Sequence, residues 1–195
     1  MKRMIEIDEY DDEFWVKVPY SSLFTKEANK LNGKWDRISK TWAFSIDVLC
    51  KVKEFCLNMY GDDGNGYEPV TIKVNLSKGD FKRGNSIYIR GIQLCTRFSK
   101  KDYVKLSKHV IIISGKFLSW GGSYNYPEVT WDDGEDLILE VKEFPKKILE
   151  NLTDEEKACI TIVEDDKVED KEFLLKEKER LLVRIAEIDK LLENM

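Results

Sequence analysis

The sequence has 195 residues, of which 42% are hydrophobic and 35% are charged, and its formal net charge at pH 7 is −5. This balance favours a globular protein over a disordered chain. No stretch approaches the roughly 20 apolar residues that cross a bilayer, and the first residues lack the apolar run of a secretory signal. We therefore expect a cytoplasmic protein.

The chain has four cysteines and one histidine. Cys50, Cys56, Cys95 and Cys159 form no CxxC pair, and His109 is the only histidine. A tetrahedral zinc site therefore lacks both its usual spacing and its ligands. We expect reduced structural thiols, no metal and no cofactor. Any Ser-His-Asp or Cys-His scheme would run through His109, which enters an apolar strand-like run, so we also expect no enzyme.

Residues 1–13 are acidic, and we expect them to form a short arm. Hydrophobic residues then alternate at positions 14, 16 and 18, which predicts a strand that ends at Pro19. A helix follows. Ser22 or Thr25 is expected to cap it, and Asn32-Gly33 is expected to end it, with Gly33 in the left-handed conformation.

Two short strands are predicted at 34–35 and 41–44, joined by a turn. They lead to a second helix, which Asp47 is expected to cap and Tyr60-Gly61 to end. Residues 14–61 thus form a complete β-α-β-β-α module. The composition of residues 62–69 is that of a linker.

Strand patterns punctuated by glycines dominate residues 70–152. They favour a partly open barrel or a curled antiparallel sheet of about five strands. Residues 153–169 are acidic and predict a flexible tether, with a short edge strand at Ile160–Val163 as an option. The predicted fold class is α+β, with a β-rich second module.

Apolar residues recur at heptad spacing in the last segment, residues 170–195, which predicts a coiled-coil helix. An isolated helix of this length is marginal in water, so its apolar stripe needs a partner. The partner is either a second copy of the chain or a groove on the same chain. We favour a homodimer, with contacts at Leu174, Leu181, Ile185, Ile188 and Leu192.

Residues 14–61 also carry a tryptophan-containing pattern, made of Val18-Pro19-Tyr20, Lys30-x-x-Gly33-x-x-Asp36 and Lys40-x-Trp42-x-Phe44. It resembles the small HARP-like module of plasmid primases, mobilisation proteins, phage proteins and annealing helicases. The resemblance covers less than a third of the chain. It implies association with DNA-processing machinery and does not imply a reaction.

Trp35 and Phe44 are predicted to close the core of this module, whereas Trp42 is predicted near its surface. Lys34, Arg37 and Lys40 surround Trp42 in the sequence. A ring flanked by cations suits single-stranded nucleic acid, because bases stack on rings while Lys and Arg neutralise phosphates. The alternative is that these residues only complete the core.

The stretch from Lys78 to Lys116, with both ends included, holds ten basic and two acidic residues, so it carries +8 and the rest of the chain −13. Tyr88 and Arg90 are expected on the same face of one strand, opposite Ile87 and Ile89. A solvated strand face and a plain hairpin loop are the alternatives to binding. The predicted nucleic-acid contacts here are Arg83, Tyr88, Arg90, Arg97, Lys101, Lys105 and Trp120.

Two functions follow as hypotheses. The first is a non-enzymatic, dimeric accessory protein of a phage or mobile element that binds single-stranded or branched DNA. The second is a phage-encoded inhibitor of a host nuclease or defence complex that acts by protein contact. In that case the acidic segments 1–13 and 128–172 would occupy the nucleic-acid groove of the partner. DNA, RNA and protein all stay open as targets.

Overall fold

The computed structural model describes residues 2–79, 81, 84–163, 175, 178 and 182. The chain divides into two compact units, residues 1–163 and 164–195. The five predicted dimer contacts, Leu174, Leu181, Ile185, Ile188 and Leu192, all lie outside the described residues. In the second unit the exposed side chains of Leu175, Lys178 and Leu182 are described. Among the described residues no helix is long and apolar enough to span a membrane.

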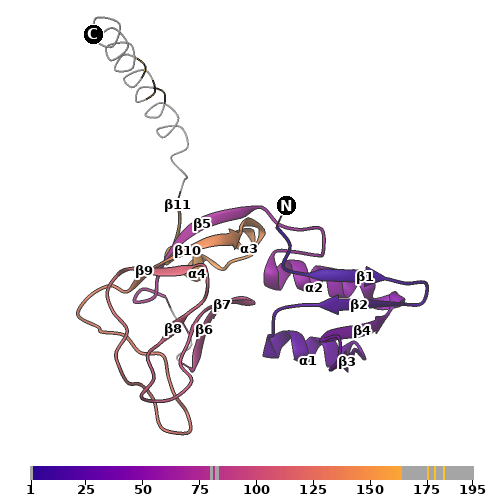
Figure 1. Cartoon of the computed structure of the whole chain (residues 1–195), viewed down its shortest axis with the longest axis horizontal. Helices are drawn as coiled ribbons and strands as arrows, with labels where there is room; N and C mark the ends of the chain where they lie inside the picture. Colours follow the sequence, from indigo (N-terminus) through magenta and orange to yellow (C-terminus); the bar gives the residue numbers. More distant parts are fainter. Residues whose placement is uncertain are drawn as a thin grey trace, which may run out of the picture. The chain divides into compact units, whose positions relative to one another are not determined.

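The first core of residues 1–163 is built on the antiparallel sheet β1-β2-β4-β3 (Figure 1). Alternation along β2 buries Phe14 and Val16, and Phe14 stacks on Phe44 of β4 at 5.3 Å between ring centroids. The predicted β-α-β-β-α order is confirmed, with one strand added before it. The elements are β1 (Glu6–Glu9), β2 (Glu13–Lys17), α1 (Ser22–Lys30), β3 (Lys34–Asp36), β4 (Thr41–Ser45), η1 (Ile46–Val48) and α2 (Leu49–Tyr60).

The added strand, β1, corrects the expectation of an acidic arm at residues 1–13. Ile5 is completely buried, and Ile7 pairs with Val16 of β2. The strand was not predicted because most of its residues are acidic and exposed. The core contacts of this segment come from Ile5, just before β1, and from Ile7 within it. Residues 4–9 are therefore part of the structure around the first core.

Residues 62–69 form an ordered loop and not the expected linker. The Asp62 side chain is completely buried. Its Oδ2 accepts hydrogen bonds from the backbone N–H groups of Met4 at 2.6 Å and Ile5 at 3.1 Å. Its Oδ1 accepts from Gly64 and Gly66, both at 2.9 Å. One carboxylate thus ties the loop to the N-terminal segment.

The helix ends differ from the predictions in detail. Ser21, one residue before the expected cap, accepts hydrogen bonds at the start of α1, and Asp47 lies in η1 before α2 begins. Asn32, with φ of 59°, takes the left-handed conformation expected for Gly33. Gly33 is needed for space, because a Cβ there would lie 2.4 Å from the Phe44 ring. The predicted end of α2 at Gly61 is confirmed.

The second core lies between two antiparallel sheets, β11-β5-β10-β9 and β6-β7-β8, and no closed barrel is present in the described part of the chain. The prediction of a β-rich module is confirmed, and the sheets are separate. The strands are β5 (Pro69–Asn75), β6 (Ser86–Ile89), β7 (Ile92–Thr96), β8 (Lys105–Leu106), β9 (Val110–Ser114), β10 (Ile138–Pro145) and β11 (Ile160–Val163), and the helices are α3 (Lys146–Glu150) and α4 (Asp154–Ala158).

The expected acidic tether begins with ordered structure. Thr153 and Glu156 form a capping box at the start of α4, in which each side chain accepts from the backbone N–H of the other. The optional edge strand is present as β11, which pairs with β5 along its whole length. The tether prediction is therefore wrong for residues 153–163, and residues 164–169 lie outside the described residues.

Candidate nucleic-acid interface

Trp35 and Trp42 lie in the reverse of their predicted positions, because Trp42 is in the first core and Trp35 is at its surface. Trp42 is 8% exposed and packs against Phe24 and Phe44, whereas Trp35 is 47% exposed. Residues 35 and 42 are partners in the β3–β4 register, so the outer ring covers the inner one. The prediction of Trp42 as a stacking surface is therefore wrong, because its ring is part of the core.

The β3–β4 turn presents two of the three predicted cations. The Asp36 carboxylate accepts hydrogen bonds from the Ser39 hydroxyl and from the backbone N–H groups of Ile38 and Ser39, and these bonds lower its pKa. Arg37 and Lys40 are exposed on this ordered turn. Lys34 instead lines a hollow with three carboxylates of the β1–β2 hairpin, which would repel phosphate: Asp11, Asp12 and Glu13.

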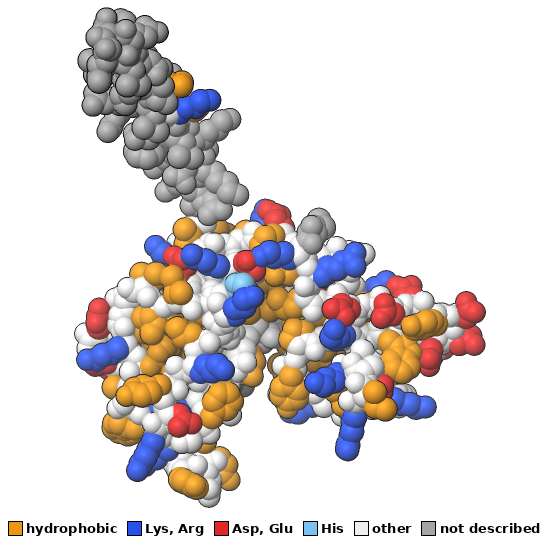
Figure 2. Space-filling view, viewed as in Figure 1, with side chains coloured by type: hydrophobic (Ala, Val, Ile, Leu, Met, Phe, Trp, Pro, Cys, Tyr) orange, Lys and Arg blue, Asp and Glu red, His pale blue; other side chains and the backbone are white. Residues whose placement is uncertain are grey.

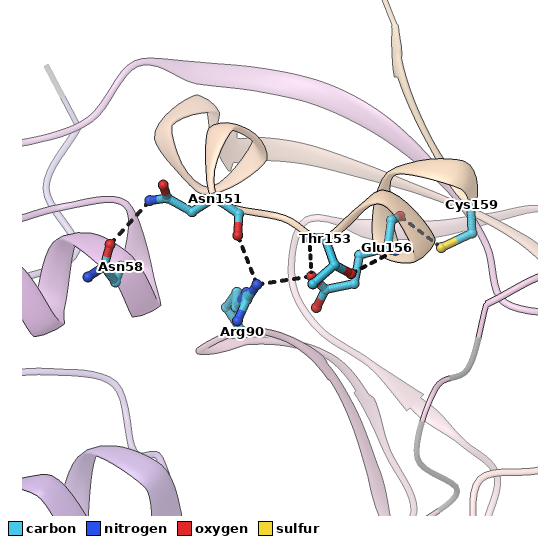
Figure 3. A network of polar contacts seen from close by, with 6 residues as sticks. All are labelled: Asn58, Arg90, Asn151, Thr153, Glu156 and Cys159. Atoms are coloured by element: carbon cyan, nitrogen blue, oxygen red, sulfur yellow. Dashed lines mark hydrogen bonds and ion pairs between the residues drawn. The ribbon is translucent and has the colours of Figure 1, made fainter.

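Arg90 joins the β6–β7 turn to the helices around it (Figure 3). Its Nη2 donates to the Asn151 carbonyl at 2.9 Å and to Glu156 Oε2 at 3.0 Å. Asn151 continues the network to Asn58 of α2. The backbone of Arg90 is in the left-handed conformation, at φ of 53°, which is unfavourable for a residue other than glycine. This geometry makes Arg90 a structural connection.

Tyr88 and Arg90 both line a groove of about 480 Å³. Ile87 and Ile89 are buried, and they line the same groove, so the lining does not separate the two pairs as the predicted alternation did. Glu155 and Glu156 line the same groove, so its charge does not favour a polyanion. These two predicted contacts are brought together, but in surroundings that fit nucleic acid poorly.

Arg97 is completely buried. Its Nη1 donates to the carbonyls of Asp102 at 2.7 Å and Lys100 at 3.4 Å, and its Nη2 donates to the Leu118 carbonyl at 2.6 Å. Burial lowers the pKa of Arg97, and the nearby charge of Asp102 acts in the opposite direction. The prediction that Arg97 contacts phosphate is wrong, because its side chain has no exposed surface. Arg83 lies outside the described residues.

Two loops next to Arg97 carry a group of exposed rings. The loop of residues 97–104 presents two of them and the loop of residues 117–131 presents three, and each ring is between 60% and 87% exposed. We call this group the aromatic surface; it consists of Phe98, Tyr103, Trp120, Tyr124 and Tyr126. Only Trp120 among these was selected from the sequence as a contact.

The second loop is held by hydrogen bonds within its own backbone. Ser123 N–H donates to the Tyr126 carbonyl at 2.8 Å, and Tyr126 N–H donates to the Ser123 hydroxyl at 3.2 Å. Gly122 has φ of 71°, and a Cβ on it would lie 2.2 Å from the Tyr126 carbonyl oxygen. Gly122 is therefore required by the geometry of the turn, which agrees with the alternative prediction of a plain hairpin loop. The same geometry leaves the rings in solvent.

Lysines accompany the aromatic surface. Lys101, Lys105 and Lys108 are exposed, and Asp102 is the acidic residue between them. In Figure 2, orange and blue side chains alternate over the lower left of the molecule, where Figure 1 shows the loops between β7 and β10. Hydrophobic rings and positive charges thus share one region of the surface.

The described residues contain no group of His, Cys, Asp or Glu side chains that could hold a metal ion. Comparison with protein-family models, with curated proteins and with solved structures finds no match to this chain. The resemblance to the HARP-like module therefore rests on its quoted residues alone.

Proposed function

We propose that this chain is a non-enzymatic accessory protein of a phage or mobile element that binds single-stranded nucleic acid in the cytoplasm. The observation that carries the proposal is the aromatic surface, five exposed rings on two ordered loops. Single exposed rings are normal on a protein surface, whereas several large apolar side chains exposed together mark a contact site. Stacking of a base on such a ring contributes about 1–3 kcal/mol and tolerates any sequence.

The charge around the rings supports the same ligand. Lys101, Lys105 and Lys108 are exposed and can neutralise phosphates, and the acidic residues of the second loop and its end, Glu128, Asp132 and Asp133, are separated from them in sequence. Neutralising phosphates releases counterions, so the affinity is expected to fall steeply with salt. A homodimer formed through residues 170–195 would bring two aromatic surfaces to one strand and raise the avidity.

The proposal is tested by fluorescence anisotropy with labelled single-stranded DNA, single-stranded RNA and duplex DNA of equal length, at two salt concentrations. We expect both single strands to bind more tightly than the duplex. Trp120→Ala, Tyr124→Ala and Tyr126→Ala should each weaken binding about tenfold if one base is lost per ring. Tyr20→Ala is the matched control, since Tyr20 is 80% exposed and lies outside the aromatic surface. No binding of any oligonucleotide at low salt would end the proposal.

The acidic β1–β2 hairpin favours a second candidate, a protein that blocks a basic nucleic-acid groove of a host nuclease or defence complex. Asp8, Glu9, Asp11, Asp12 and Glu13 are all exposed on it. Figure 2 shows red side chains gathered at the end of the molecule that holds this hairpin. Such an inhibitor would capture a stoichiometric partner from nuclease-treated lysate. Asp11→Lys with Asp12→Lys should abolish the capture, and Trp120→Ala should leave it intact.

A further inference from the structure

The two loops of the aromatic surface are joined by one side chain. Arg97 starts the first loop, and its guanidinium reaches the carbonyls of Lys100 and Asp102 in the same loop and of Leu118 in the second. The Lys100 carbonyl also accepts from Gly121 N–H at 3.3 Å. Among the described residues, every hydrogen-bond acceptor of the Arg97 guanidinium is therefore a main-chain carbonyl of the two loops that present the rings.

This arrangement is unusual for a side chain that serves only packing. Arg97 is 0% exposed, and its Nε is buried without a hydrogen-bond partner in the described part of the chain. Burying a charge is costly, and an apolar side chain of similar volume often serves a core equally well. A guanidinium offers what an apolar chain cannot, a rigid planar fork that holds several carbonyls in fixed positions.

We infer that Arg97 is a positioning residue, which fastens the two loops into one preorganised surface for single-stranded nucleic acid. This inference rests on the proposed function. If the loops were mobile, ordering them on binding would reduce the binding free energy. A side chain that orders them beforehand removes this loss and raises the affinity. Phe98 and Tyr103 on one loop then keep a constant spacing from Trp120 on the other, so that successive bases can meet successive rings.

The clamp makes a prediction that separates it from a phosphate contact. A residue that neutralises a phosphate contributes to the salt dependence, and its loss lowers the salt slope by about one. Arg97 has no exposed surface, so its loss should lower the affinity at every salt concentration and leave the slope unchanged. Lys101 is exposed, so its replacement should lower the slope of affinity against salt.

The test compares the full-length wild type with Arg97→Lys, Arg97→Met and Lys101→Met. Hydrogen exchange is measured over residues 98–103 and 118–127, and oligonucleotide affinity is measured against salt. We expect both Arg97 variants to exchange faster in both loops, to keep the protection of β5 and β10, and to bind about tenfold more weakly with an unchanged slope. Lys101→Met should lower the slope and leave the exchange unchanged.

Arg97→Lys keeps the charge and much of the side-chain volume, so the test can be made with this variant if Arg97→Met does not fold. A lower slope with unchanged loop exchange would overturn the inference, because it would mean that Arg97 contacts phosphate. Faster exchange with unchanged affinity would overturn it as well, since preorganisation would then not matter for binding. If the wild type binds no oligonucleotide, the proposed function fails. The exchange measurement then still shows whether Arg97 joins the loops.

Discussion

Trp35 and Trp42 face each other across the β3–β4 pair, with ring centroids 5.4 Å apart and ring planes at 53°. Trp42 meets Phe24 edge-on at 6.3 Å on its other side. The Trp42 ring therefore has aromatic neighbours on two sides, whereas the Trp35 ring, on the edge strand β3, is 47% exposed. The two side chains should contribute very differently to stability.

Trp42→Ala is expected to lower the free energy of unfolding by about 3–5 kcal/mol, because it leaves a large cavity among packed rings. Trp35→Ala should cost only about 1–2 kcal/mol, since roughly half of that ring is already in water. Urea unfolding followed by circular dichroism measures both changes. A loss for Trp35→Ala equal to or greater than that for Trp42→Ala would contradict the assignment of core and cover.

Asp62 gives a second test, of the ordered loop at residues 62–69. Asp62→Ala leaves the buried N–H groups of Met4 and Ile5 without their acceptor. A buried donor without a partner costs about 1–3 kcal/mol, so the loss should reach about 3 kcal/mol or more. Hydrogen exchange at residues 4–7 should accelerate. Asp62→Asn keeps one acceptor oxygen and should show a smaller effect. Unchanged exchange in both variants would restore the view of this segment as a linker.

The four cysteines are expected to differ in reactivity. Burial raises the pKa of Cys56 and of Cys95 to about 12, and it also raises the pKa of Cys159, whose thiol donates to the Glu156 carbonyl. Cys50 is exposed. A thiol reagent at pH 8 should therefore label Cys50 rapidly in the folded protein, because only thiolates react. The other three should react after unfolding. Rapid labelling of Cys50→Ser would show that a second thiol is accessible.

Sequence patterns predicted an element correctly where hydrophobic residues alternate clearly or where a glycine ends a helix. The alternation of Phe14 and Val16 identified β2, and Gly61 ended α2 where predicted. The optional strand at Ile160–Val163 is likewise present. Each of these depends on local geometry, which a short stretch of residues determines by itself.

The misplaced residues depend on partners that are distant in sequence. Which of Trp35 and Trp42 lies inside is decided by the helix that covers the sheet, through Phe24. Arg97 is buried because Leu118, 21 residues away, supplies a carbonyl for it. An arginine between Thr96 and Phe98 carries no local sign of such burial, and the local excess of positive charge led to the prediction that it is on the surface. The five rings of the aromatic surface likewise lie in two segments of the sequence, and neither segment by itself shows that hydrogen bonds join the two loops.

The stability of the β10 region should depend on pH through Glu143. A hydrogen bond from Lys2, with smaller contributions from His109 and Lys108, holds the pKa of Glu143 below its ordinary value of 4.5. A lowered folded-state pKa stabilises the folded state above the unfolded-state pKa, and this contribution is lost as the pH falls through the folded-state value. Thermal unfolding of wild type and Glu143→Gln should therefore differ near pH 6, and the difference should shrink as the pH falls below about 4.5. A difference that grows on acidification would refute this coupling.

The heptad spacing of residues 170–195 still predicts self-association, and Leu175 and Leu182 within it are exposed apolar side chains. Leu181→Asp with Ile188→Asp places charges in the apolar stripe, so we expect a folded monomer where the wild type is a dimer. Light scattering after size exclusion measures the mass, and circular dichroism checks the fold. Arg180→Asp changes the charge at a position that the heptad spacing places outside the stripe, so it should leave the dimer intact. If the double variant unfolds residues 1–163 as well, the stripe packs on its own chain, and the two copies of the aromatic surface needed for avidity must be brought together by another contact.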